Sequence, residues 1–238
     1  MSKDIKKDKF VKFYARTWSD PKVLELDFFE ERFFLTSWSN MFSIKGISGI
    51  YEISRGGYES MLGFSDERLE MLNKYGIKVP NKDRFLARKI IDKIAESFNT
   101  KYTSMLEYDV PNHMVSVKNY FKYQYKTIGN VAVAIKMLLN EANAFFNKSE
   151  RLWIEFGRKN QDDLIEMAEK LDEYIKQNDL LLFDLNNEHK NKLERKEKPS
   201  SDLLRKINNT KENLSEYRKL KPRFANLLKK LRLTPSLP

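Results

Sequence analysis

The sequence predicts a mostly α-helical protein with a small β-hairpin, and two patterns along its 238 residues favour this fold class. Apolar residues recur at the spacing of amphipathic helices through most of the chain. Short runs that alternate between apolar and polar residues, typical of strands, fall in the first half beside turn sequences. Hydrophobic residues make up 41% of the chain, which is enough for a packed core and excludes a wholly disordered protein.

The first half begins with a helix whose expected cap is Asp27. After a glycine-flanked turn, the alternating sequence GIYEI (residues 49–53) predicts a strand, and two short helices are expected over residues 54–62 and 65–75. The apolar stripe of the first helix consists of Phe29, Phe33, Phe34, Trp38, Met41 and Phe42.

The clearest helix of the first half spans residues 82–98. Two strands follow, over residues 102–108 and 113–118, and the turn sequence Asp-Val-Pro-Asn joins them. The order helix, strand, helix, helix, hairpin is the one that a winged helix-turn-helix domain requires, so we expect this domain over residues 10–126. The buried face of the last helix is expected to consist of Ala87, Ile90, Ile91, Ile94 and Phe98.

The second half is predicted to be helical over residues 127–185, with one helix over 130–146 and another from Ser149 to about residue 178. These helices are expected to pack on each other or on a second subunit. The apolar sequence LLLFDL (residues 180–185) fits a strand, a last helical turn or an interface. Residues 186–238 are expected to form a basic tail with a linker up to Ser201, a helix to about residue 220, and a last helix opened by Pro222.

The charge is distributed unevenly along the chain. The net charge is +10, and residues 189–238 contain 15 Lys and Arg against 5 Asp and Glu, so the rest of the chain is neutral. A neutral body with a basic segment indicates that this segment meets a polyanion, with nucleic acid as the first candidate. The alternatives are a tail that only keeps the protein soluble, or one that meets an acidic membrane or protein.

The sequence lacks the residues that several classes of enzyme and metal site need. The chain has no Cys and only two His, which argues against a thiol nucleophile, a Cys-based metal site and a His-based dyad. Neither GxxxxGK[ST] nor GxGxxG occurs, and no spacing of carboxylates singles out a nuclease centre. We therefore expect no enzyme activity, cofactor or metal. The charged first residues and the short apolar runs predict a cytoplasmic protein without a membrane segment.

Three motifs occur in order: WSDPKV (residues 18–23), GIYEI (49–53) and VSVKNYFKY (115–123). Together they resemble the N-terminal winged-helix module of phage and plasmid replication proteins, which is related to the DnaD and DnaB replication-initiation family of Gram-positive bacteria. In that module the third motif is the strand that ends the wing. The resemblance covers roughly residues 10–126. Residues 73–83 look like an insertion, and the second half lacks the aromatic signature of a DnaD-type C-terminal domain.

The resemblance implies a replication initiator or replisome organiser that works in a bacterial host cell. In such a protein the winged helix would bind origin DNA, and the helical second half would form a homo-oligomer or recruit a replicative helicase or its loader. A winged-helix transcriptional regulator is a second interpretation, and a structural or protein-interaction module with an incidental basic tail is a third. A terminal protein that primes replication is a further alternative, for which no priming hydroxyl stands out.

The candidate DNA-binding residues fall in three places. On the helix before the wing, the face opposite the Ile stripe carries Arg84, Arg88, Lys89 and Lys93, which would reach the major groove. The wing adds Lys101, Lys118 and Lys122, beside the aromatic residues Tyr120, Tyr123 and Tyr125, which fit either stacking on bases or covering the protein core. The tail adds Arg205, Arg218, Arg223, Lys229 and Lys230, which would bind phosphates without reading sequence.

Overall fold

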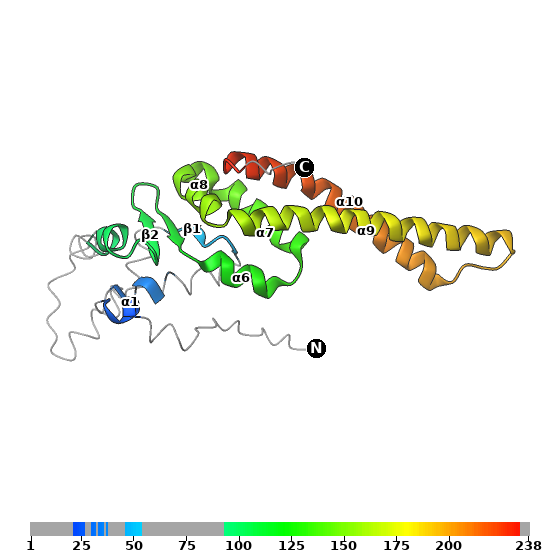
Figure 1. The fold of residues 1–238 in the computed structure, drawn as a ribbon, viewed down its shortest axis with the longest axis horizontal. Helices are drawn as coiled ribbons and strands as arrows, with labels where there is room; N and C mark the ends of the chain where they lie inside the picture. Colours follow the sequence, from blue (N-terminus) through cyan, green and yellow to red (C-terminus); the bar gives the residue numbers. More distant parts are fainter. Residues whose placement is uncertain are drawn as a thin grey trace, which may run out of the picture. The chain divides into compact units, whose positions relative to one another are not determined.

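A computed structural model describes residues 21–26, 30, 31, 33–35, 37, 46–53 and 93–233 of the chain. It is mostly helical, with a three-stranded antiparallel sheet and two long helices near the C-terminus, as the sequence predicts (Figure 1). The chain divides into two compact units. The first comprises residues 1–123 and 144–152, and the second comprises residues 124–143 and 153–238.

The sheet of the first unit consists of β1 (Ile50–Glu52), β2 (Leu106–Asp109) and β3 (Met114–Val117), in the order β1-β3-β2. β2 and β3 form the predicted hairpin, with Leu106 opposite Val117, and β1 pairs with the other edge of β3. The hairpin turn uses Asn112, whose side-chain amide donates to Asp109 at 3.0 Å, and His113, whose φ is 54°. The predicted hairpin and the strand at GIYEI are therefore confirmed, but β2 begins at Leu106 and not at residue 102 as predicted.

Aromatic side chains from the predicted helices pack against this sheet. The described helical residues 93–100 bury Ile94 and Phe98, and the helical residues between 30 and 37 bury Phe33 and Phe34. The Phe33 and Phe98 rings stack at 5.7 Å between centroids, and Phe33 meets Tyr108 of β2 at 6.1 Å. The burial predicted for these four residues is confirmed. The other residues of both predicted stripes lie outside the described part of the chain.

The junction after the wing differs from the prediction. The motif VSVKNYFKY does not continue as a strand, because β3 ends at Val117 and helix α6 (Tyr120–Ile128) begins three residues later. Asn119 lies between them with a φ of 62°, a left-handed conformation that Asn tolerates better than most residues. Gly49 faces this junction at a φ of 83°, where an added Cβ would lie 2.5 Å from the Val117 carbonyl oxygen.

The second unit is built on the helices of the second half. Helix α7 (Val131–Phe145) begins where predicted, because Asn130 Oδ1 accepts bonds from the backbone N–H groups of Ala132 and Val133 at 3.0 and 3.2 Å. Helix α8 (Glu150–Lys159) follows a single 3₁₀ turn over Phe146–Lys148. No helix in the described part of the chain is long and apolar enough to cross a membrane.

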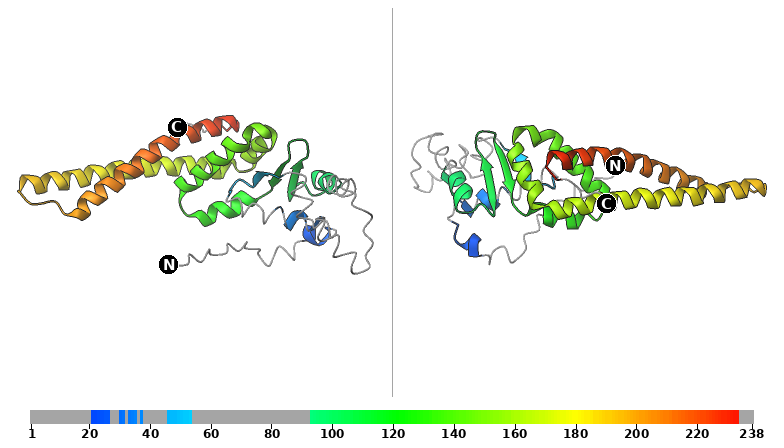
Figure 2. Two further views of the ribbon diagram at one scale, coloured as in Figure 1. Left: turned by 180° about the vertical axis from the view of Figure 1, so that it is seen from behind. Right: turned by 45° about the horizontal axis from the view of Figure 1, so that its top comes forward.

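Two long helices, α9 (Gln161–Glu194) and α10 (Ser201–Lys230), form a hairpin and run side by side (Figures 1 and 2). The predicted linker over residues 186–201 is wrong, since only residues 195–200 separate the helices. The predicted start of a new helix at Pro222 is wrong too, because α10 passes through it. Pro222 is exposed, so the helix face that loses a backbone hydrogen bond is turned toward water.

A heptad repeat explains why the helices of this hairpin continue. In α9 residues 164, 171, 178 and 185 recur every seven positions, and in α10 residues 203, 210, 217 and 224 do the same, followed by Leu231 directly after the helix. Leu185 packs with Leu203 and Ile207 between the two helices, and the rings of Tyr174 and Tyr217 lie 6.3 Å apart. The basic segment is therefore half of a coiled-coil hairpin rather than a partly helical tail.

Candidate nucleic-acid interface

In the described part of the helix before the wing, buried and exposed residues lie on different faces, as predicted. Ile94 and Phe98 are 5% and 0% exposed, whereas Lys93 is exposed. Lys101 is exposed directly after this helix. The other basic residues predicted for the helix, Arg84, Arg88 and Lys89, lie outside the described residues, as do the two short helices expected before it.

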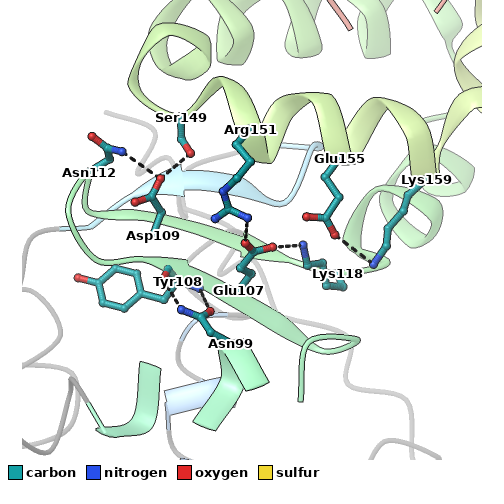
Figure 3. Close-up of polar contacts among 10 residues, drawn as sticks. All are labelled: Asn99, Glu107, Tyr108, Asp109, Asn112, Lys118, Ser149, Arg151, Glu155 and Lys159. Atoms are coloured by element: carbon teal, nitrogen blue, oxygen red, sulfur yellow. Dashed lines mark hydrogen bonds and ion pairs between the residues drawn. The ribbon is translucent and has the colours of Figure 1, made fainter. Parts of the chain in front are cut away.

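The expectation that Lys118 offers its charge at the surface of the wing is wrong. Its side chain is only 4% exposed, and its Nζ lies 2.7 Å from Glu107 Oε2 on β2. The exposed Arg151, at the start of α8, donates to the other oxygen of the same carboxylate (Figure 3). Lys118 is turned inward because its backbone N–H still bonds the Met105 carbonyl, at 2.9 Å, just before the chain reverses at Asn119.

These contacts attach residues 144–152 to the sheet of the first unit. Ser149 donates its hydroxyl hydrogen to Asp109 at 2.7 Å, and Lys148 pairs with Glu52 of β1. Asp109 also accepts from Asn112 in the wing turn (Figure 3). Carboxylates of two strands thus bind this segment, and the charges on this side of the sheet serve the protein's own packing.

The aromatic residues after the wing belong to the protein interior. Tyr120 is 1% exposed and part of the core of the first unit, and Phe121 is also 1% exposed, so neither is placed to stack on bases. Lys122 is exposed on α6, as predicted. Tyr125 is half-buried, and burial raises the pKa of its hydroxyl. The side chain of Tyr123 lies outside the described residues.

The strongest concentration of positive charge lies in the C-terminal half of α10. After Glu216 the chain has seven basic residues and no acidic one. Arg218 and Lys221 are neutralised across the hairpin, with Arg218 2.8 Å from Asp179 and Lys221 2.8 Å from Asp172. The remaining five basic residues, all exposed, are Lys219, Arg223, Lys229, Lys230 and Arg232.

Helical spacing places Lys219, Arg223 and Lys230 on one face of α10, because they follow each other by four and seven residues. This face is opposite the seam with α9, and it extends about 16 Å along the helix. The face therefore presents a row of cations to solvent, at a scale that spans several phosphates of a nucleic-acid strand.

Helix α8 contributes a cation that the sequence pattern does not reveal. Gly157 lies against Leu231, where an added Cβ would come within 2.9 Å of the leucine Cβ. The next residue, Arg158, is exposed, so it joins the charges around the end of α10. A glycine inside an amphipathic helix, just before two basic residues, is the signal that could have indicated a close helix contact. The basic end is defined here as Arg158, Lys219, Arg223, Lys229, Lys230 and Arg232.

Two of the predicted tail residues do not belong to the basic end. Arg218 holds both oxygens of Asp179, at 2.8 and 3.1 Å, and so has a structural partner. Arg205 lies 3.3 Å from Asp202 in the first turns of α10. That part of the hairpin, from Asp172 to Glu216, contains ten acidic and nine basic residues and has almost no net charge.

The second unit also has an open hollow of about 320 Å³, lined in part by Tyr125, Asp163, Glu166, Lys170 and Tyr174. The hydrogen bond that Lys170 donates to Glu166 raises the pKa of Lys170, and the nearby Tyr125 hydroxyl contributes further. The charged groups of the hollow are therefore engaged with one another. In the described residues no three His, Asp or Glu side chains cluster as a metal site would require.

Comparisons of the chain with protein-family models, with curated proteins and with solved structures gave no match.

Proposed function

We propose that this protein binds DNA and acts as a replication initiator or replisome organiser of a phage or plasmid. The observation that carries the proposal is the basic end, where six exposed cations gather around the last turns of α8 and α10. Exposed Lys and Arg in a stretch of sequence with no acidic residue after Glu216 favour a polyanion, because each phosphate contact releases a counterion. The other surface of the hairpin has balanced charge, so binding is expected at one end only.

The first unit supports a DNA-binding role in a different way. A helix directly before a two-stranded hairpin, with a third strand on the far edge of β3, is the arrangement of a winged helix. In such domains the helix reads base edges while the wing follows the backbone. The exposed Lys93, Lys101 and Lys122 are the described residues of this unit that would contact DNA. We expect this unit to supply preference for a site and the basic end to supply affinity.

The replication role comes from the three sequence motifs that resemble phage and plasmid replication proteins. Recruitment of a helicase or its loader is part of the same proposal. A transcriptional regulator would use the same winged helix, and it differs by where it binds: protection of a promoter rather than of a replication origin would favour it.

Gel shifts of the full chain test the proposal, with origin duplex of the source replicon, random duplex and single-stranded DNA at low and moderate salt. We expect binding to all three at low salt and a preference for origin duplex at moderate salt, followed by a footprint within the origin. No binding to any DNA at low salt would refute the proposal and favour a protein-interaction module.

A further inference from the structure

The half of the helical hairpin near its loop exposes an unusual amount of apolar surface. Of the seven large hydrophobic side chains that are exposed in the described part of the chain, five lie in this half. Their exposed fractions are 67% for Leu180, 48% for Leu181, 64% for Phe183, 54% for Leu193 and 43% for Leu204. Single exposed leucines are common, but a group this concentrated marks a surface that another molecule covers.

Helix geometry explains why the hairpin cannot cover these side chains itself. Leu182 and Leu185 face α10 and pack with Leu203 and Ile207. At about 100° per residue, Leu180 and Phe183 lie about 60° apart on the opposite side of α9. A two-helix hairpin buries one seam only, and α9 and α10 are the two helices that run together here (Figure 2). The outward face of α9 is therefore apolar in its middle.

The charges around this face fit a second copy of the same chain. Residues 172–216 have ten acidic and nine basic side chains, so two copies approach without strong repulsion, and a polyanion gains nothing there. Glu173 precedes the apolar pair and Lys190 follows it at a similar distance. In an antiparallel copy of α9 these two opposite charges meet at each end of the contact.

We propose that the protein self-associates through the outward face of α9, with Leu180 and Phe183 packed against the same residues of an antiparallel second copy. The two hairpins then form a four-helix arrangement, and Glu173 of each copy pairs with Lys190 of the other. Within one chain both residues have only exposed neighbours one turn away on α9: Glu173 accepts from Gln177, and Lys190 lies 3.8 Å from Glu194. Both charges can therefore turn toward a partner at little cost.

Sedimentation equilibrium of the full chain without nucleic acid tests this inference. We expect a dimer that dissociates on dilution, and a dissociation constant at least tenfold weaker in the variant L180S/F183S. The matched control is V133S, since Val133 is 46% exposed on α7 and lies outside the proposed face. Circular dichroism of each variant checks that the helices remain folded.

A charge exchange tests the antiparallel alignment. We expect E173K and K190E each to weaken self-association, and the double variant E173K/K190E to recover it. A wild-type chain that remains monomeric at high concentration, or an L180S/F183S variant that associates as tightly as wild type, overturns the proposal. Failure of the double variant to recover overturns the antiparallel pairing. None of these measurements depends on DNA, so their failure is distinct from failure of the proposed function.

Discussion

Replacing Arg223, Lys229 and Lys230 by glutamine removes three charges from the basic end. All three side chains are exposed, and they are distinct from Arg218 and Lys221, which pair with α9, so the hairpin should keep its packing. If the basic end binds phosphates, the variant will bind duplex DNA more weakly and with a smaller dependence on salt. Deleting residues 189–238 would be a poorer test, because it removes α10 and with it the seam of the coiled coil.

The size of the effect follows from counterion release. Each phosphate contact contributes about −0.9 to the slope of log affinity against log salt concentration, so the loss of three contacts makes the slope shallower by about 2.7. Between about 50 and about 200 mM salt, the wild-type chain should therefore lose about 40-fold more affinity than the variant. This difference is large enough to measure by fluorescence anisotropy with a labelled random duplex.

A second variant with the same change in charge provides the control. Lys198, Lys206 and Lys211 are exposed in the charge-balanced half of the hairpin, and their replacement by glutamine should leave the slope nearly unchanged. Equal slopes for the wild-type chain and the basic-end variant would refute the assignment of the basic end. Equal losses in both variants would show that only total charge matters.

Three further predictions concern the folded chain and are measured by urea denaturation. E107Q should lower the free energy of unfolding by about 3–5 kcal/mol, because it leaves the ammonium of Lys118 buried without its counter-charge. The double variant E107Q/K118M should recover much of this loss, and no recovery would contradict the reasoning. G49A should destabilise by more than about 1 kcal/mol, since its Cβ would meet the Val117 carbonyl at a φ that alanine disfavours. S200A should cost about 1 kcal/mol through loss of the α10 cap, and an unchanged midpoint would show that the cap is dispensable.

Local patterns predicted much of the fold. Alternating apolar and polar residues predicted the strands of the hairpin and the strand at GIYEI, and turn residues predicted the hairpin turn. The Asn130 cap predicted the start of α7. Each of these patterns lies within a few residues of the element that it predicts. The burial of Phe33, Phe34, Ile94 and Phe98 follows from helical spacing alone. These predictions succeeded because the physical cause and the pattern lie in the same short segment.

Predictions failed where a distant segment decides the outcome. Residues 186–194 were predicted to be a linker because they are polar, yet they continue α9 past Leu185, which packs against Leu203 and Ile207 of α10. Pro222 read as a helix start, yet packing on both sides of it keeps α10 continuous. Lys118 read as a surface cation, and only the fold shows that Glu107 and the inward end of β3 bury it.

The sequence by itself determined the class of the fold, the strands of the wing and the excess of positive charge in the last fifty residues, because composition, periodicity and turn chemistry are local properties. The tertiary structure decided which of those charges are neutralised across the hairpin. Pairing with Asp172 and Asp179 across the hairpin neutralises Arg218 and Lys221, and the close approach of Gly157 to Leu231 brings Arg158 to the end of α10. Packing and pairing between helices, which the sequence does not show, decide where the remaining positive charge gathers on the surface.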